Sequence, residues 1–138
     1  MFKIYNETKH NVDYNEAEIE SWIASSLKKE GFKIGNVEII LLSDRDITEI
    51  NKEYLGHHYP TDVITFTQEK KISLSGSIYI GIEMVKQNAI LHNESLRNEF
   101  YRVVIHAVLH LAGYKDITKE EKVRMSGKED YYLKEIFT

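Results

Sequence analysis

The sequence contains no cysteine and only one proline among its 138 residues. The absence of cysteine excludes disulfide bonds, thiolate metal ligands and cysteine nucleophiles. Any bound metal must therefore be held by imidazole and carboxylate groups, which draws attention to the six histidines. One proline and seven glycines, without a repeating pattern, also exclude collagen-like and proline-rich disordered segments.

Long apolar runs and an excess of basic residues are missing as well. No run approaches the roughly 18 to 20 residues of a membrane-spanning helix, and the start, MFKIYNETKH, lacks the features of a signal peptide. We therefore expect a cytoplasmic protein with no membrane partner. The net charge of −4 argues against a wide basic surface for nucleic acid, and we expect no DNA partner. A small, locally positive cleft is compatible with this charge.

The composition, with 42% hydrophobic residues, suits a single domain over residues 1–138. Hydrophobic periodicity and capping residues divide the chain into four strands and five helices. The expected strands cover 2–5, 35–43, 62–67 and 72–82, and the expected helices cover 15–31, 43–55, 83–91, 94–112 and 118–137. This order predicts an α+β fold, with one small mixed sheet of about four strands packed with about five helices.

Several details of the packing follow from local patterns. The run GNVEIILLS at 35–43 favours a strand buried on both faces. Strands 62–67 and 72–82 should form an antiparallel pair joined by a turn around Gln68 to Lys71, and Gly76 should mark a close approach of another backbone. Helix 94–112 contains VVIHAVLHLA and should run through the interior, with its histidines among few polar neighbours. Residues 128–130 are most simply a solvated face.

Two histidines on that central helix have the spacing of metal ligands. His106 and His110 are four residues apart, so their side chains lie one turn apart on the same face. Gly113 can then turn the chain and return Asp116 to the pair, in the pattern H-x-x-x-H-x-x-G-x-x-D. Metzincin zinc proteases have this spacing with histidine in third place. Three protein ligands leave a fourth position open for water, as in catalytic zinc sites.

The competing interpretation is that the two histidines are hydrogen-bonded core residues. We favour a metal, because two unpaired buried imidazoles are costly and a carboxylate follows at the required offset. Zn²⁺ suits two nitrogen ligands and one oxygen ligand, although nickel, iron and copper are alternatives. The residue after His106 is Ala107, where H-E-x-x-H proteases have a glutamate as general base. Ordinary peptidase chemistry is therefore disfavoured, and another group must carry protons.

Three blocks in order match the motifs of a known family. In the segment INKEYLGHHYPTDVITF, the residues that match the family motif are Asn51, Tyr54, Pro60, Thr61, Asp62, Val63 and Phe66. In SGSIYIGIEMVKQNA the matching residues are Gly76 and Ile78. In HAVLHLAGYKD they are His106, His110, Leu111, Gly113, Tyr114 and Asp116. From about Val37 to Met125 the chain thus resembles the YbeY family of bacterial ribosomal RNA maturation factors, which are metal-dependent endoribonucleases. The resemblance implies that the substrate is single-stranded RNA of the ribosomal small subunit.

The chain departs from the family pattern at three positions. The third ligand is usually histidine, and here it is Asp116. An arginine proposed to face substrate phosphate is replaced by Leu55, and a usual aspartate is replaced by Ser77.

Other residues are candidates for the missing roles. The water on the metal would be the attacking group, with His57, His58 and Arg102 as helpers. Arg102 lies four residues before His106, so it shares the ligand face unless it simply pairs with Glu99 or Asp116. Substrate contacts are expected from a further set of residues, namely Lys115, Thr61 and Tyr114. Thr61 and Asp62 can also order the loop or hydrogen-bond a ligand.

Our leading hypothesis is a zinc-dependent single-strand endoribonuclease that acts in small-subunit ribosomal RNA maturation and ribosome quality control. One alternative is a hydrolase of the metalloprotease type, favoured by the ligand spacing and weakened by Ala107. The other is a non-catalytic ribosome assembly factor with a structural metal.

Overall fold

The computed structural model describes residues 1–68 and 72–137. It contains the expected four strands and five helices. In chain order they are β1 (Phe2–Asn6), α1 (Glu16–Lys29), β2 (Lys33–Leu42), α2 (Asp44–Leu55), β3 (Val63–Thr67), β4 (Ser73–Gly81), α3 (Ile82–Leu91), α4 (Leu96–Leu111) and α5 (Lys119–Lys134). The predicted α+β class is confirmed. The predicted turn around Gln68 to Lys71 falls largely outside the described residues.

The strands form one mixed sheet in the order β1-β2-β4-β3. Strands β1, β2 and β4 are parallel, whereas β3 runs antiparallel to β4 at the edge, as predicted. Gly76 lies opposite Thr67 in this pair. A Cβ atom on Gly76 would lie 2.5 Å from the carbonyl oxygen of Phe66, which confirms the predicted close approach of another backbone.

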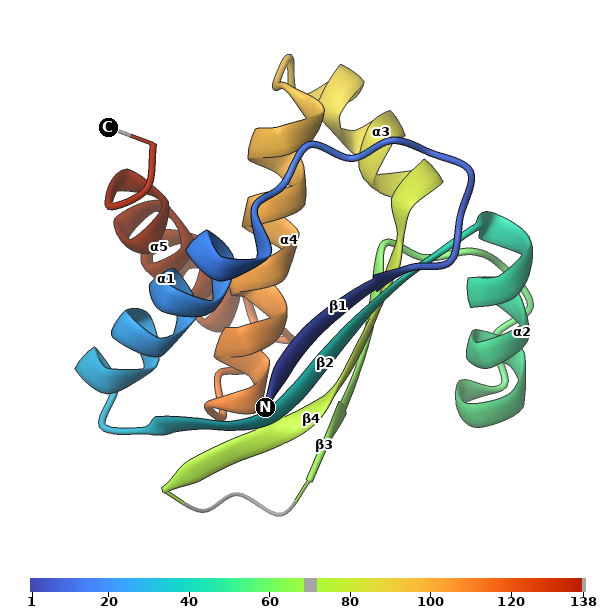
Figure 1. The fold of residues 1–138 in the computed structure, drawn as a ribbon. Helices are drawn as coiled ribbons and strands as arrows, with labels where there is room; N and C mark the ends of the chain where they lie inside the picture. The colour runs from blue at the N-terminus through green and yellow to red at the C-terminus, as the bar shows by residue number, and fades with distance from the viewer. Residues whose placement is uncertain (69–71, 138) are drawn as a thin grey trace.

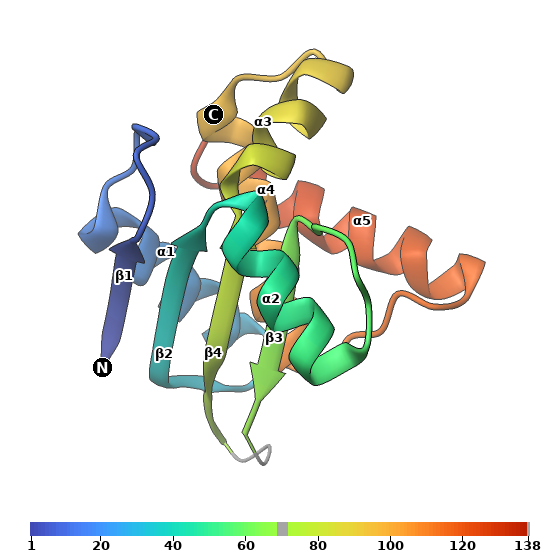
Figure 2. The same ribbon diagram turned by 90° about the vertical axis from the view of Figure 1, so that its right-hand side faces the viewer.

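Helices cover the two faces of the sheet unequally. Helices α1, α4 and α5 lie on one side of the sheet and α2 lies on the other (Figures 1 and 2). The larger core lies on the α4 side, while a small cluster of Leu42, Ile47 and Ile64 lies under α2. The expectation that 35–43 is buried on both faces was therefore wrong for its first half. Glu38 is exposed, because α2 covers only part of the second face.

Capping residues mark the ends of the first two helices. The side chains of Asn15 and Ser43 accept hydrogen bonds from backbone N–H groups in the first turns of α1 and α2. At the other end of α2, Gly56 has a φ of +70°, which a residue without a Cβ adopts at no steric cost. Along residues 1–68 and 72–137, no helix has both the length and the apolar character needed to cross a lipid bilayer.

Helix α4 is the central element of the larger core. It packs against β3, β4, α3 and α5, and most of its side chains are buried. Its two histidines lie near its carboxyl end and are only partly buried. The helix thus presents one polar strip at the place where α5 and the preceding loop meet it.

Candidate metal centre

After α4 ends, the chain turns back toward the last turns of this helix. Gly113 adopts a φ of +103°, and its N–H donates to the carbonyl of His110 at 3.0 Å. The N–H of Tyr114 donates to the carbonyl of Leu109, also at 3.0 Å. These two bonds form a Schellman motif, which ends a helix and reverses the chain direction. The predicted glycine turn is confirmed, and it carries Asp116 back to the helix.

The structure brings the three predicted ligands together. The Nε2 atoms of His106 and His110 are 3.1 Å apart, and Oδ2 of Asp116 lies 3.2 Å from Nε2 of His110 and 3.3 Å from Nε2 of His106. Each residue thus offers one donor atom to a common point. Ligand bonds of about 2.0 to 2.2 Å in a tetrahedral site place ligand atoms about 3.3 to 3.6 Å apart. The observed triangle can hold a cation after small movements.

Hydrogen bonds at the two Nδ1 atoms fix the orientation of both imidazole rings. Nδ1 of His106 lies 2.6 Å from Oε2 of Glu129, and Nδ1 of His110 lies 2.9 Å from the carbonyl oxygen of Tyr114. Carboxylates and carbonyls accept hydrogen bonds, so both Nδ1 atoms carry the proton and donate. When the rings are neutral, both Nε2 atoms present lone pairs toward Asp116. Three acceptor atoms then face one another, and a cation between them relieves their repulsion.

The electrostatic environment of His106 also favours positive charge. Burial lowers the pKa of His106, but the hydrogen bond and charge of Glu129, followed by the charges of Asp116 and Asp62, raise it above its ordinary value. The same negative groups that stabilise an imidazolium also stabilise a metal ion. The expectation of few polar neighbours for the histidines was therefore wrong, since acidic residues from three different segments approach them.

Glu129 is the residue that the sequence interpretation missed. Residues 128–130 were predicted to be solvated, yet Glu129 is only 6% exposed and contacts both His106 and Arg102. A signal existed in the helical period. Glu129 follows Met125 by four residues and precedes Leu133 by four, and both of these are buried, so the buried face of α5 includes it.

The helper residues occupy different surroundings. Arg102 does share the ligand face, but it pairs with Glu129 at 3.0 Å and Asp130 at 2.8 Å, not with Glu99 or Asp116. His57 and His58 are exposed on the loop after α2, where His57 stacks on Tyr59. Within the described parts of the chain, neither imidazole makes a hydrogen bond or an ion pair.

The residues predicted to contact substrate are also distributed unevenly. The Tyr114 hydroxyl donates to Oε1 of Glu30 at 2.7 Å, so Tyr114 meets the ligand cluster through its main-chain carbonyl. Lys115 is exposed beside Asp116. Thr61 lies in the loop before β3, and its hydroxyl donates to Oδ1 of Asp62 at 3.4 Å.

The other two substituted positions are Leu55 and Ser77. Leu55 ends α2 and is 51% exposed. Ser77 alternates along β4 with the buried residues Gly76 and Ile78, so its side chain points away from the α4 face. The Ser77 hydroxyl donates to Oε1 of Glu38 at 2.9 Å.

Comparisons with known proteins identify the family of this chain. The family model described as Endoribonuclease YbeY matches residues 3–137. An Endoribonuclease YbeY from Chlorobium phaeobacteroides is 39% identical over 99% of this chain and 94% of its own, and one from Karelsulcia muelleri is 42% identical over 96% and 94%. The solution structure of a Thermotoga maritima protein superimposes with a TM-score of 0.70 at 30% identity, covering 99% of this chain and 89% of that one. The chain therefore belongs to the endoribonuclease YbeY family.

Proposed function

We propose that this chain cleaves single-stranded RNA with the help of one zinc ion held by His106, His110 and Asp116. As a member of the family it is a metal-dependent endoribonuclease that acts in ribosomal RNA processing. The observation that carries the proposal is the triangle of Nε2, Nε2 and Oδ2 atoms, 3.1 to 3.3 Å apart. Both Nδ1 atoms already donate elsewhere, so only the Nε2 atoms are free to bind an ion.

The donor set suits zinc better than a harder cation. Two imidazole nitrogens and one carboxylate oxygen are common zinc ligands, whereas magnesium and calcium prefer oxygen alone. When bound, the ion supplies positive charge that stabilises phosphoryl oxygens and activates water as a nucleophile. Because Asp116 carries a negative charge, it offsets more of the ion's charge than the family's usual histidine would.

The protein groups around the cluster have separate proposed roles. Glu129 and the Tyr114 carbonyl accept hydrogen bonds from the Nδ1 atoms of the two imidazoles. Lys115, exposed next to Asp116, provides local positive charge for a substrate phosphate. His57 and His58 lie on an exposed loop that is free to contact RNA, and the Thr61 hydroxyl donates to Asp62 just before β3.

The same proposal covers the biological setting. The substrate is RNA of the ribosomal small subunit, the location is the cytoplasm, and residues 1–138 work as one domain. The acidic overall charge of −4 suits a protein that approaches RNA through a restricted region. Attack by water on phosphorus and attack by the adjacent 2′-hydroxyl are both compatible with the cluster.

The test is elemental analysis and cleavage of a labelled unstructured RNA on the same purified samples. Wild type and His92→Ala should contain near-stoichiometric zinc and cleave, because His92 lies on the exposed turn between α3 and α4. His110→Ala and Asp116→Ala should lose both metal and cleavage. Circular dichroism checks that all four proteins are folded.

Other results would contradict different parts of the proposed function. Cleavage by metal-free wild type would refute the catalytic role of the ion. Zinc without RNA cleavage would favour the assembly factor, and cleavage of a peptide library in place of RNA would favour the metalloprotease. The peptidase alternative has no base beside the first ligand, because that position is the buried Ala107.

A further inference from the structure

A buried carboxylate bridges two successive turns of α4. Glu129 of α5 places Oε2 at 2.6 Å from Nδ1 of His106 and Oε1 at 3.0 Å from Nη1 of Arg102. Both oxygens are thus used, and the residue is only 6% exposed. Burying a carboxylate is costly unless it is paired, so this position on an amphipathic helix would ordinarily hold an apolar side chain.

We propose that Glu129 is a positioning residue that holds His106 as the Nδ1–H tautomer and thereby increases the affinity of the site for zinc. The proposal rests on the metal site proposed above. A metal-binding histidine commonly donates its second N–H to a carboxylate or carbonyl, which orients the ring and makes the other nitrogen a better ligand. In His106 the nitrogen left to bind the metal is Nε2, which faces His110 and Asp116.

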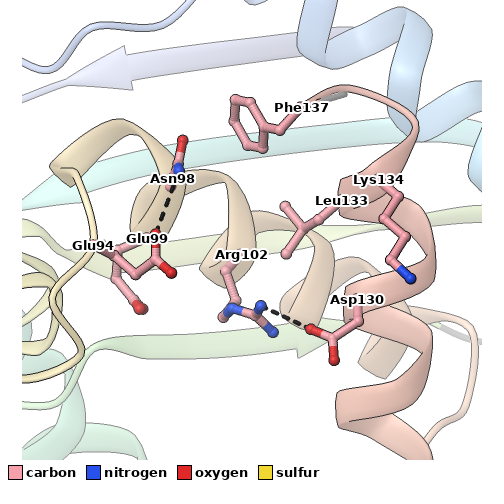
Figure 3. Close-up of a pocket in the computed structure, with 8 residues that line it drawn as sticks. All are labelled: Glu94, Asn98, Glu99, Arg102, Asp130, Leu133, Lys134 and Phe137. Atoms are coloured by element: carbon pink, nitrogen blue, oxygen red, sulfur yellow. Dashed lines mark hydrogen bonds and ion pairs between the residues drawn. The ribbon is translucent and has the colours of Figure 1, made fainter.

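Arg102 keeps the carboxylate in place. Its guanidinium lies between Glu129 and the more exposed Asp130, and Figure 3 shows it directed toward Asp130 across the junction of α4 and α5. The positive charge compensates the buried Glu129, and the planar fork reaches both carboxylates at once. Arg102 therefore acts on the site through Glu129, with its two terminal nitrogens already occupied.

The two histidines are supported unequally. His110 donates to the neutral carbonyl of Tyr114, whereas His106 donates to a charged carboxylate at a shorter distance. A charged acceptor makes the stronger hydrogen bond and pushes more electron density into the ring. The support of His106 also comes from a different helix, so it depends on the packing of α5 against α4.

A matched pair of isosteric substitutions tests the proposal. Glu129→Gln and Asp130→Asn each remove one carboxylate that pairs with Arg102, but only Glu129 contacts His106. Zinc affinity is measured by competition with a chromophoric chelator at fixed pH. We expect Glu129→Gln to weaken zinc binding about 10- to 100-fold and Asp130→Asn to stay within about twofold of wild type. Unchanged affinity in Glu129→Gln, or equal loss in both variants, would overturn the proposal.

A second measurement uses the wild type and needs no variant to fold. The nitrogen NMR shifts of His106 in metal-free protein, at a pH where the ring is neutral, report which nitrogen carries the proton. We expect Nδ1–H to dominate, and a dominant Nε2–H form would refute the role of Glu129. If wild type binds no zinc, the proposed metal site fails, while the tautomer measurement still decides what Glu129 does.

Discussion

The carboxylate of Glu30 offers the sharpest stability test, because it joins three segments. Oε1 accepts from the Tyr114 hydroxyl at 2.7 Å, while Oε2 accepts from Lys128 at 3.0 Å and from the Tyr132 hydroxyl. The side chain is only 11% exposed, at the end of α1. It thus ties α1 to the loop that carries Asp116 and to the helix that carries Glu129.

Replacing Glu30 by glutamine keeps the shape and removes the charge. Hydrogen bonds to a charged group contribute about 1.5 to 3 kcal/mol, and neutral ones about 0.5 to 1.5 kcal/mol. The change thus costs about 1 kcal/mol for each of the three hydrogen bonds. The bond from Lys128 contributes less than this, because the Lys128 side chain is partly exposed to solvent. We expect Glu30→Gln to lower the free energy of unfolding by about 2 to 3 kcal/mol. Glu135→Gln, which removes the charge of a surface pair with Lys29, should change the free energy of unfolding much less than Glu30→Gln does.

The pH dependence of the Glu30 effect has a definite sign. Burial raises the pKa of Glu30, but hydrogen bonds from Tyr132, Tyr114 and Lys128 outweigh it and hold the pKa below its ordinary value of 4.5. A lowered folded-state pKa stabilises the protein above the unfolded value, and this stability is lost as the pH falls through the folded value. The difference between wild type and Glu30→Gln should therefore narrow below pH 4.5.

Urea denaturation of wild type, Glu30→Gln and Glu135→Gln at neutral and acidic pH measures these differences. A Glu30→Gln protein within about 0.5 kcal/mol of wild type at neutral pH would refute the hydrogen-bond estimate. A difference that is the same at both pH values would show that the charge of Glu30 is not what matters.

Three further predictions concern packing, substrate and ligand. Gly76→Ala should destabilise by about 1 to 3 kcal/mol or more, because its Cβ would lie 2.5 Å from the Phe66 carbonyl oxygen and 2.8 Å from Leu111 Cδ2. Gly127→Ala should stabilise the protein by about 0.5 to 1 kcal/mol, because a Cβ at this position in α5 would meet open space. Thermal unfolding of the two glycine variants tests this pair of predictions, and a change of the same sign and size in both would contradict them. Leu55→Arg should lower the KM for RNA about tenfold at low salt by adding a charge at an exposed position, whereas an unchanged KM would show that this position does not meet phosphate. Asp116→His should retain zinc while Asp116→Leu loses it, as elemental analysis will show; retention by the leucine variant would remove Asp116 from the ligand set.

Local rules predicted the elements and the ligand triangle well. The four-residue spacing of His106 and His110 depends only on the helical period, and Gly113 depends only on the backbone freedom of glycine. Both act within a few residues, so they are visible in a short stretch of sequence. The positions of Asn15 and Ser43 as helix caps follow from the same kind of local hydrogen bonding.

The predictions that were wrong all depended on contacts between distant segments. Whether the second face of β2 is covered depends on where α2 packs, and α2 reaches only part of it. The polar surroundings of His106 depend on Glu129, which lies 23 residues further along and approaches only when α5 packs against α4. The run at 128–130 has the composition of a solvent-exposed face, and composition alone does not show which side of the helix is covered.

The sequence by itself thus determined the order of elements, the glycine turn and the three donors that can meet at one point. The tertiary structure decided what surrounds those donors, namely the carboxylate behind His106, the engagement of Arg102 and the Glu30 bonds that join α1 to α5. The physical reason is that periodicity and capping act within one or two helical turns, whereas burial and ion pairing depend on which distant surfaces pack together.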